Sequence, residues 1–170
     1  LATQFAVQEG RAEDATWSSE EQRAVEEVRR DVEERFEGPL RSACYNGFPK
    51  AVEAALQVDW VELNRGNENG ATLTPLWIAC RHGHLEVVRM LLSTDGILVN
   101  EATKEYGVTP LYIACQRGHL EVVRMLLSTD GILVNEATKE YGVTPLYIAC
   151  QRGHLEVVRM LLSTDGILVN

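Results

Sequence analysis

The stretch Asn100–Val134, NEATKEYGVTPLYIACQRGHLEVVRMLLSTDGILV, recurs without a single change as Asn135–Val169. Self-similarity at a fixed period between about 20 and 50 residues is typical of repeat proteins, whose units bury their core by stacking on one another. We therefore expect an array of structural repeats. Such arrays usually bind partners and seldom catalyse reactions.

The same pattern extends toward the N-terminus. Pro75 lies 35 residues before Pro110, and the copy that it begins differs from the later ones at three positions. These positions are Trp77, Arg81 and His82. A fourth, diverged copy begins with Pro39–Gly47, which keeps the Pro-Leu, Ala-Cys and Gly landmarks. We place the four units at about 38–64, 65–99, 100–134 and 135–170.

Each unit contains signals for two short helices. In the third unit, Thr109 is a helix N-cap, Pro110 suits the first helical position, and Gly118 suits the C-terminal end. A second helix is expected from about His119 to Leu127, followed by an extended apolar strip, Ile132–Val134. Helices this short are not stable alone, so stacking must stabilise them.

Apolar spacing predicts which faces of these helices are buried. On the first helix one face is shared by Leu111, Ala114 and Cys115. On the second helix the expected buried stripe is Leu120, Val123, Leu126 and Leu127. Glu121 and Arg124 lie three residues apart on its outer face and can form a weak ion pair.

This pattern resembles the ankyrin repeat. The signature of that family is matched by Gly107, Thr109–Leu111, Ala114, Gly118–His119 and Val123–Leu127, and it is met again in register at 74–92 and 142–162. The resemblance covers about residues 39–170. It implies an all-α fold, an α-solenoid of helix-turn-helix repeats with hairpin loops.

Two departures from the family pattern stand out. The period is 35 instead of the usual 33, with one extra residue in the hairpin around Tyr106 and one in the exit loop Ser128–Val134. The residue after Thr-Pro-Leu, commonly His in the family, is Trp77, Tyr112 or Tyr147. A Tyr hydroxyl could replace the hydrogen bonds of that His, whereas an indole can only donate.

Charge and hydropathy indicate which classes of partner the chain is expected to bind. Residues 1–38 hold 11 acidic and 5 basic side chains, so most of the net charge of −9 lies there and the array is nearly neutral. A nucleic-acid partner needs a positive surface, so none is expected. No apolar run approaches the ~18 residues of a membrane span, and nothing resembles a signal peptide.

Four cysteines, Cys44, Cys80, Cys115 and Cys150, occupy the same place in successive units. Stacked helices lie ~8–10 Å apart, and a disulfide needs Cα atoms within about 7 Å. We therefore expect buried free thiols, which indicate an intracellular protein, in the cytoplasm.

No catalytic or metal site is predicted. His84, His119 and His154 recur at 35-residue intervals, too far apart to share a zinc ion, and each is expected to bond to the helix-helix turn. Phosphate loops and His-Glu-x-x-His or Gly-x-Ser-x-Gly motifs do not occur in the sequence. The chain is expected to be no enzyme and to need no cofactor.

The resemblance implies that hairpin tips and the inner face of the first helices form a concave binding groove. The corresponding positions are Leu73, Arg81, His82, Tyr106, Val108, Gln116, Arg117, Tyr141, Val143, Gln151 and Arg152. Tyr and Arg are common binding anchors. The alternatives are that Tyr106 and Tyr141 merely pack hairpin on hairpin, and that the arginines form a solvated face.

The two ends differ from the array. Residues 1–17 read as a poorly structured tail and 18–37 as an amphipathic helix that opens with the capping box Ser18–Glu21. This helix either covers the first repeat or docks on another protein. The last copy is as apolar as the internal ones, so either more repeats follow or this end packs on a partner.

The favoured function is a non-catalytic protein–protein interaction module that binds a protein partner of unspecified identity through its groove. The first alternative is a structural subunit or linker of a large assembly, held through its terminal helix and uncapped end. The second is a targeting or regulatory arm of an enzyme whose catalytic domain lies beyond 1–170.

Overall fold

A computed structural model describes residues 38–57, 62–66 and 73–169. This part of the chain contains eight α-helices and no strand. They form four consecutive pairs, α3 (Pro39–Asn46) with α4 (Pro49–Leu56), α5 (Pro75–His82) with α6 (Leu85–Leu92), α7 (Pro110–Arg117) with α8 (Leu120–Leu127), and α9 (Pro145–Arg152) with α10 (Leu155–Leu162). The tail and helix expected at 1–37 lie outside the described residues.

The helix boundaries follow from local capping chemistry. The Thr109 side chain accepts a hydrogen bond from the Tyr112 backbone N–H at 3.1 Å, and Pro110 occupies the first helical position of α7. Gly118 ends the helix with φ 72°, a left-handed conformation that glycine adopts without steric cost. Equivalent Thr, Pro and Gly residues begin and end α5 and α9, so the expected helix ends are confirmed there.

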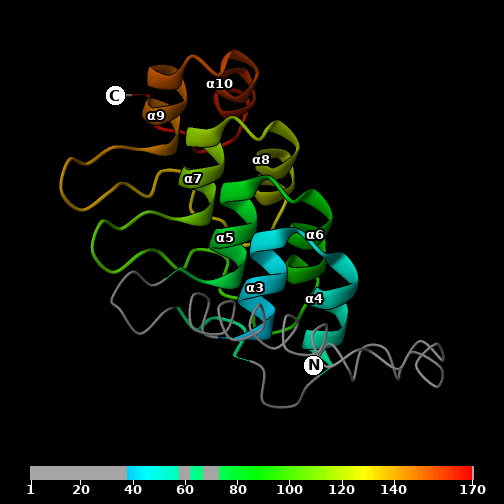
Figure 1. The fold of residues 1–170 in the computed structure, drawn as a ribbon. Coiled ribbons are helices and arrows are strands. Elements are labelled where there is room, and N and C mark those ends of the chain that lie inside the picture. The colour runs from blue at the N-terminus through cyan, green and yellow to red at the C-terminus, as the bar shows by residue number, and fades with distance from the viewer. Residues whose placement is uncertain (1–37, 58–61, 67–72, 170) are drawn as a thin grey trace, which may run out of the picture.

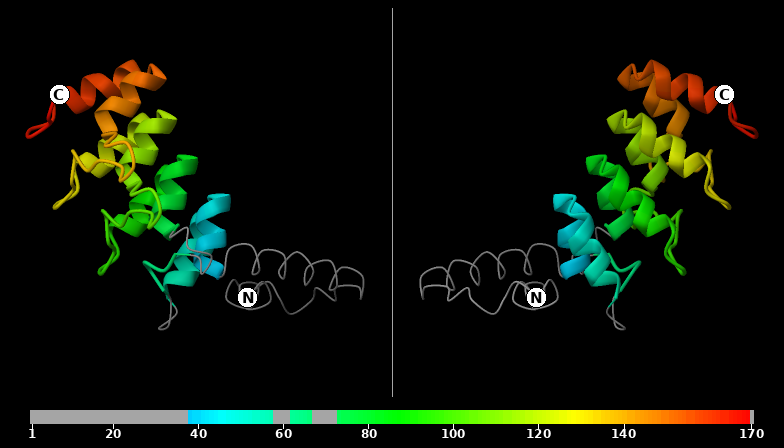
Figure 2. Two further views of the ribbon diagram at one scale, coloured as in Figure 1. Left: turned by 90° about the vertical axis from the view of Figure 1, so that its left-hand side faces the viewer. Right: turned by 90° about the vertical axis from the view of Figure 1, so that its right-hand side faces the viewer.

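The pairs stack into a two-layered solenoid (Figure 1). The first helices, α3, α5, α7 and α9, pack in one row, and the second helices, α4, α6, α8 and α10, pack behind them. Figure 1 shows the hairpin loops projecting from one side of the stack, and Figure 2 shows the exit loops after the second helices projecting beside successive repeats. Each helix pair therefore contacts mainly the pairs before and after it.

The buried face of the second helix differs from the expected stripe. In α8, Val123 and Leu126 are buried as expected, but Val122 is the third buried residue, and Leu120 and Leu127 are only half-buried. The reason is that α8 packs against α7 and also between α6 and α10. Its buried surface is set by three neighbours and not by a single stripe.

Histidines join successive repeats. Each imidazole Nε2 donates a hydrogen bond to a backbone carbonyl at the end of the preceding repeat's first helix. The three bonds are His84 to Tyr45 at 3.0 Å, His119 to Arg81 at 3.1 Å and His154 to Gln116 at 3.2 Å. The expected bond to a helix-helix turn is therefore made across repeats.

Asparagines join the exit loops in the same way. The side chain of Asn100 donates to the Gly131 carbonyl at 2.8 Å and accepts from the Leu133 N–H at 3.0 Å. Asn64 and Asn135 make the same pair of bonds one repeat before and after. These contacts join the end of one exit loop to the next exit loop along the stack.

All four thiols are free, and their burial follows position in the stack. Cys44, Cys80 and Cys115 are buried, whereas Cys150 is exposed because no described element packs beyond α9. In the described part of the chain, no helix combines the length and apolar composition that crossing a bilayer requires.

A candidate binding groove

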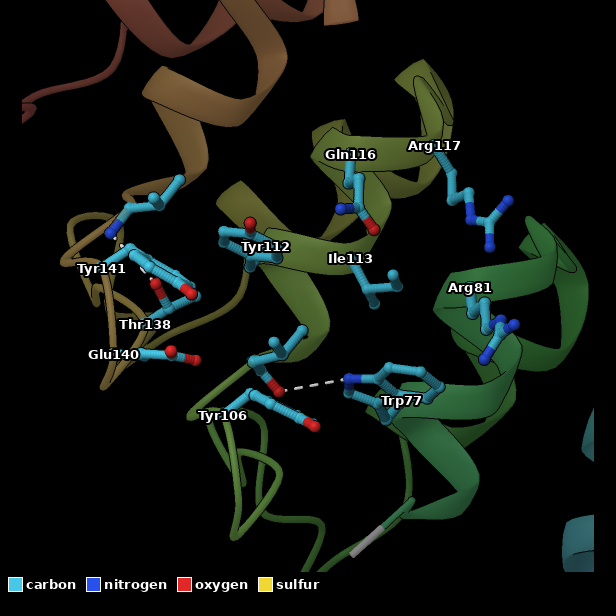
Figure 3. Close-up of a pocket in the computed structure, with 12 residues that line it drawn as sticks. Trp77, Arg81, Tyr106, Tyr112, Ile113, Gln116, Arg117, Thr138, Glu140 and Tyr141 are labelled. Carbon is cyan, nitrogen blue, oxygen red and sulfur yellow. Dashed lines mark hydrogen bonds between the residues drawn. The ribbon is translucent and has the colours of Figure 1, made fainter. Parts of the chain in front are cut away.

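The inner face of the stack carries a hollow of about 350 Å³ between α5, α7 and two hairpin loops, 103–108 and 138–143. Figure 3 shows Trp77 and Arg81 reaching it from α5, Tyr112, Ile113, Gln116 and Arg117 from α7, and Tyr106, Thr138, Glu140 and Tyr141 from the hairpins. The hollow is therefore built by two consecutive repeats and part of a third.

A second hollow of about 560 Å³ continues the first toward α9. The two share Tyr112, Gln116, Tyr141 and Val143 in their linings. The second adds residues of the last repeat, which are Gly142, Tyr147, Ile148, Gln151 and Arg152. Together they make one continuous groove across three repeats, which we call the inner groove.

Trp77 fixes one hairpin to the floor of the inner groove. Its indole Nε1 donates to the Val108 carbonyl oxygen at 3.1 Å, a bond to the next repeat's hairpin that Figure 3 draws as a dashed line. The Arg81 guanidinium lies over the same ring, 5.5 Å from its centroid. The indole therefore acts as a donor, as expected, while no hydroxyl bond of Tyr112 or Tyr147 is present among the described residues.

The two hairpins are joined by Lys139. Its backbone N–H donates to the Tyr106 carbonyl at 3.0 Å, and its Nζ donates to the Lys104 carbonyl at 2.7 Å. The side chains of Tyr106 and Tyr141 remain 50% and 76% exposed. The contact between hairpins is thus made by lysine and backbone, and the two Tyr rings stay accessible at the groove edge.

The tip of each hairpin pairs a tyrosine with the carboxylate before it. A hydrogen bond to Glu105 raises the pKa of the Tyr106 phenol, and a bond to Glu140 raises the pKa of the Tyr141 phenol. A carboxylate favours the protonated phenol because the phenol is then a donor and uncharged. Both phenols therefore stay protonated to a higher pH than an ordinary tyrosine.

Arginines on the two sides of the stack have different environments. On the outer helices Arg89, Arg124 and Arg159 pair with Glu residues three positions earlier, at 3.3, 3.3 and 2.7 Å. On the groove side the arginines are Arg81, Arg117 and Arg152, all exposed and without an ion pair to any residue the structure describes. The groove side therefore presents positive charge that the described fold leaves uncompensated.

Nine of the eleven residues expected at the groove line it, namely Arg81, Tyr106, Val108, Gln116, Arg117, Tyr141, Val143, Gln151 and Arg152. The other two lie elsewhere. Leu73 packs half-buried against the core. His82 contacts Tyr45 edge-on, with ring centroids 4.6 Å apart, and burial together with the charge of Arg81 lowers its pKa.

The lining also holds residues that sequence reasoning did not assign to it, which are Trp77, Tyr112, Ile113, Thr138, Glu140, Gly142, Tyr147 and Ile148. Three of these carried a signal, because Trp77, Tyr112 and Tyr147 follow Thr-Pro-Leu where His is common. No sequence signal points to Thr138 or Glu140, because they belong to a hairpin whose placement depends on the neighbouring repeat.

Metal-ligating side chains do not gather in the described ranges, where no three His, Cys, Asp or Glu residues lie close enough to hold an ion. The His ladder has the structural role described above. The inner groove presents aromatic rings, guanidinium groups and amides, and Tyr, Trp and Arg are residue types that often anchor partners at protein interfaces.

Comparison with protein families agrees with this geometry. The family model for ankyrin repeats matches the chain in three copies, over residues 5–103, 40–135 and 98–170. The chain belongs to the ankyrin repeat family. Ankyrin repeats are generally protein–protein interaction modules, and domains built of them are typically non-catalytic scaffolds. No curated protein sequence gives a significant match.

Proposed function

We propose that the chain is a non-catalytic interaction module that binds a segment of a protein partner along the inner groove. The observation that carries this proposal is the continuity of the groove across three repeats, with nine expected contact residues in its lining. Aromatic and arginine side chains are the residues that most often dominate binding energy at protein interfaces.

The groove is also held in shape before a partner arrives. Trp77 holds the hairpin at Val108, Lys139 holds one hairpin to the other, and the helices behind them share one hydrophobic core. A preorganised surface loses less conformational entropy on association, so more of the contact energy remains as affinity. This supports recognition by a rigid groove.

The test begins with peptides selected from a random displayed library on the unmodified protein. Their affinities are then measured for Tyr106→Ala/Tyr141→Ala, which truncates two exposed rings at the groove edge. The matched control is Leu98→Ala/Leu133→Ala, which truncates two exposed apolar side chains in exit loops of the array, outside the groove lining.

The proposal expects the Tyr variant to weaken binding at least about tenfold, a loss of roughly 1.4 kcal/mol, and the Leu variant to leave the affinity unchanged. A selection that yields no binder, or binders equally affected by both variants, would overturn it.

A further inference from the structure

The arginines of the inner groove recur at the repeat spacing. Arg117 and Arg152 occupy the same position in identical units and line consecutive hollows. Their counterparts on the outer helices, Arg124 and Arg159, are compensated by glutamates of their own helix. Among the residues that the structure describes, the same two repeats thus hold one pair of arginines with glutamate partners and one pair without.

We propose that the inner groove binds an acidic, proline-containing segment in polyproline II conformation, with carboxylates at every third residue facing Arg117 and Arg152. This inference rests on the proposed function and specifies the chemistry of the partner.

The spacing of the repeats selects the conformation. Consecutive first helices in such a stack lie ~8–10 Å apart. Polyproline II has three residues per turn and rises about 3.1 Å per residue, so residues i and i+3 point the same way about 9 Å apart. In a β-strand, residues three apart point to opposite faces. Of these two extended conformations, the threefold helix is the one that presents a carboxylate to each successive arginine without twisting.

The floor of the groove suits the same conformation. Trp77, Tyr112 and Tyr147 supply one aromatic ring per repeat, and the first two line one hollow while the last two line the next. Aromatic-lined grooves dock proline-rich polyproline II segments in several recognition domains, because that helix is already ordered and loses little entropy. Prolines between the acidic residues would lie against the exposed parts of these rings, which are small at Trp77 and Tyr112 and larger at Tyr147.

The groove is positive along one side only. Figure 3 shows Arg81 and Arg117 at one side of the hollow and Glu140 at the other. Glu140 is the sole acidic residue among the lining residues of the two hollows. A peptide with one acidic face matches this division, whereas a nucleic acid would bring phosphates against Glu140 and into a chain of net charge −9.

The experiment measures fluorescence anisotropy of a nine-residue probe, three repeats of Glu-Pro-Pro carrying an uncharged dye, at 50 mM salt. Two peptide controls are three repeats of Gln-Pro-Pro and a shuffled peptide of the same composition with its glutamates two residues apart. The groove variant is Arg117→Gln/Arg152→Gln. Its matched control is Arg124→Gln/Arg159→Gln, which removes the same charge from the outer face of the same repeats.

We expect the Glu-Pro-Pro probe to bind more tightly than both peptide controls. The groove variant should weaken it about tenfold, within the range expected for two exposed charge pairs, and the outer variant should not. Binding should also weaken as salt is raised. Equal binding of the shuffled peptide, equal effects of the two variants, or tighter binding of an oligothymidylate would overturn the inference.

A failure of the acidic polyproline II ligand can be distinguished from a failure of the proposed function. If library-selected peptides depend on Tyr106 and Tyr141 but carry no acidic residues at threefold spacing, the groove binds a partner of other chemistry. The interaction module would then stand, and the acidic polyproline II ligand would not.

Discussion

The imidazole of His154 lies directly against Gly118 of the preceding repeat. A Cβ added to Gly118 would come within 2.6 Å of the ring, whose Nε2 donates to the Gln116 carbonyl two residues earlier at 3.2 Å. The glycine that ends one helix pair thus also makes room for the histidine that fastens the next pair. The same relationship joins His119 to Gly83.

The first prediction compares Gly118→Ala with Gly153→Ala. Both glycines have left-handed φ, at 72° and 74°, so both substitutions cost about 1–2 kcal/mol of backbone strain. Only at Gly118 does the new methyl group meet a histidine ring, while at Gly153 nothing lies within 4 Å. We expect Gly118→Ala to cost about 1–3 kcal/mol more, through the clash and the lost hydrogen bond.

Urea denaturation followed by circular dichroism measures this difference, and amide exchange of α9 and α10 locates it. Equal destabilisation by the two alanines would show that the His–Gly contact between repeats contributes nothing beyond backbone strain.

The second prediction concerns the asparagine bridge between exit loops. Asn100→Ala removes two hydrogen bonds to the exit loop that follows α8, at Gly131 and Leu133, and should destabilise the array by about 1–2 kcal/mol. Asn100→Asp keeps the acceptor and should cost less. Asn46→Ala is the control, because it removes one bond within its own helix pair, to Ser42. A similar urea midpoint for the Asn46 and Asn100 alanine variants would contradict the bridging role.

The third prediction concerns Trp77. In Trp77→Phe the bond to the Val108 carbonyl is lost, although that carbonyl keeps its bond from the Thr103 N–H. We expect a loss of about 1 kcal/mol and faster amide exchange in the 103–108 hairpin. Tyr112→Phe, which removes a hydroxyl without a hydrogen bond among the described residues, should leave both unchanged. Exchange rates that do not respond to the indole would argue that other contacts hold the hairpin.

The fourth prediction is the reactivity of the thiols. Burial raises the pKa of Cys44 and Cys115 to about 12, and burial raises the pKa of Cys80 as well. Since the thiolate is the reactive form, only about one in ten thousand such groups is ionised at pH 8. A thiol reagent should therefore modify Cys150 alone in the native chain, and all four cysteines in denaturant.

Mass spectrometry after timed modification checks this, with Cys150→Ser expected to lose the fast phase. The raised pKa values also set a pH dependence. The folded chain keeps protons that an unfolded chain releases above its ordinary thiol pKa of 9.0, so the free energy of unfolding should fall as pH rises beyond it. Rapid modification of a second native cysteine would contradict the burial of the inner thiols.

Much of the fold could be predicted because its signals are local. Thr109, Pro110 and Gly118 fix a helix within a dozen residues, and their chemistry depends on no distant contact. The burial of Val122 could not be predicted in this way, since it depends on how α8 lies against α6 and α10. The apolar periodicity of a single helix predicts one buried face. It cannot show that three neighbouring helices pack against that helix.

The candidate site likewise has a part that local sequence signals predict and a part that depends on neighbouring repeats. Positions along the first helix and the hairpin, such as Gln116 and Tyr106, could be assigned from the repeat pattern, and the structure brings them together. The acceptor of the Trp77 indole N–H could not be predicted from the sequence, because Val108 lies 31 residues away in the next repeat. Glu140 was missed for a related reason, since its place opposite the arginines depends on the hairpin held by Lys139.

Nuclear magnetic resonance of the Trp77 indole N–H tests the central claim, recognition along the inner groove, most directly. This group lies within the groove lining and donates to Val108, so its resonance should respond to any ligand seated there. Trp77→Phe assigns the signal by its loss. The account predicts that a library-selected peptide shifts this resonance on binding. The shift should reach its plateau at the peptide concentration that saturates the protein. A peptide that saturates the protein while the Trp77 indole resonance stays in place would contradict it.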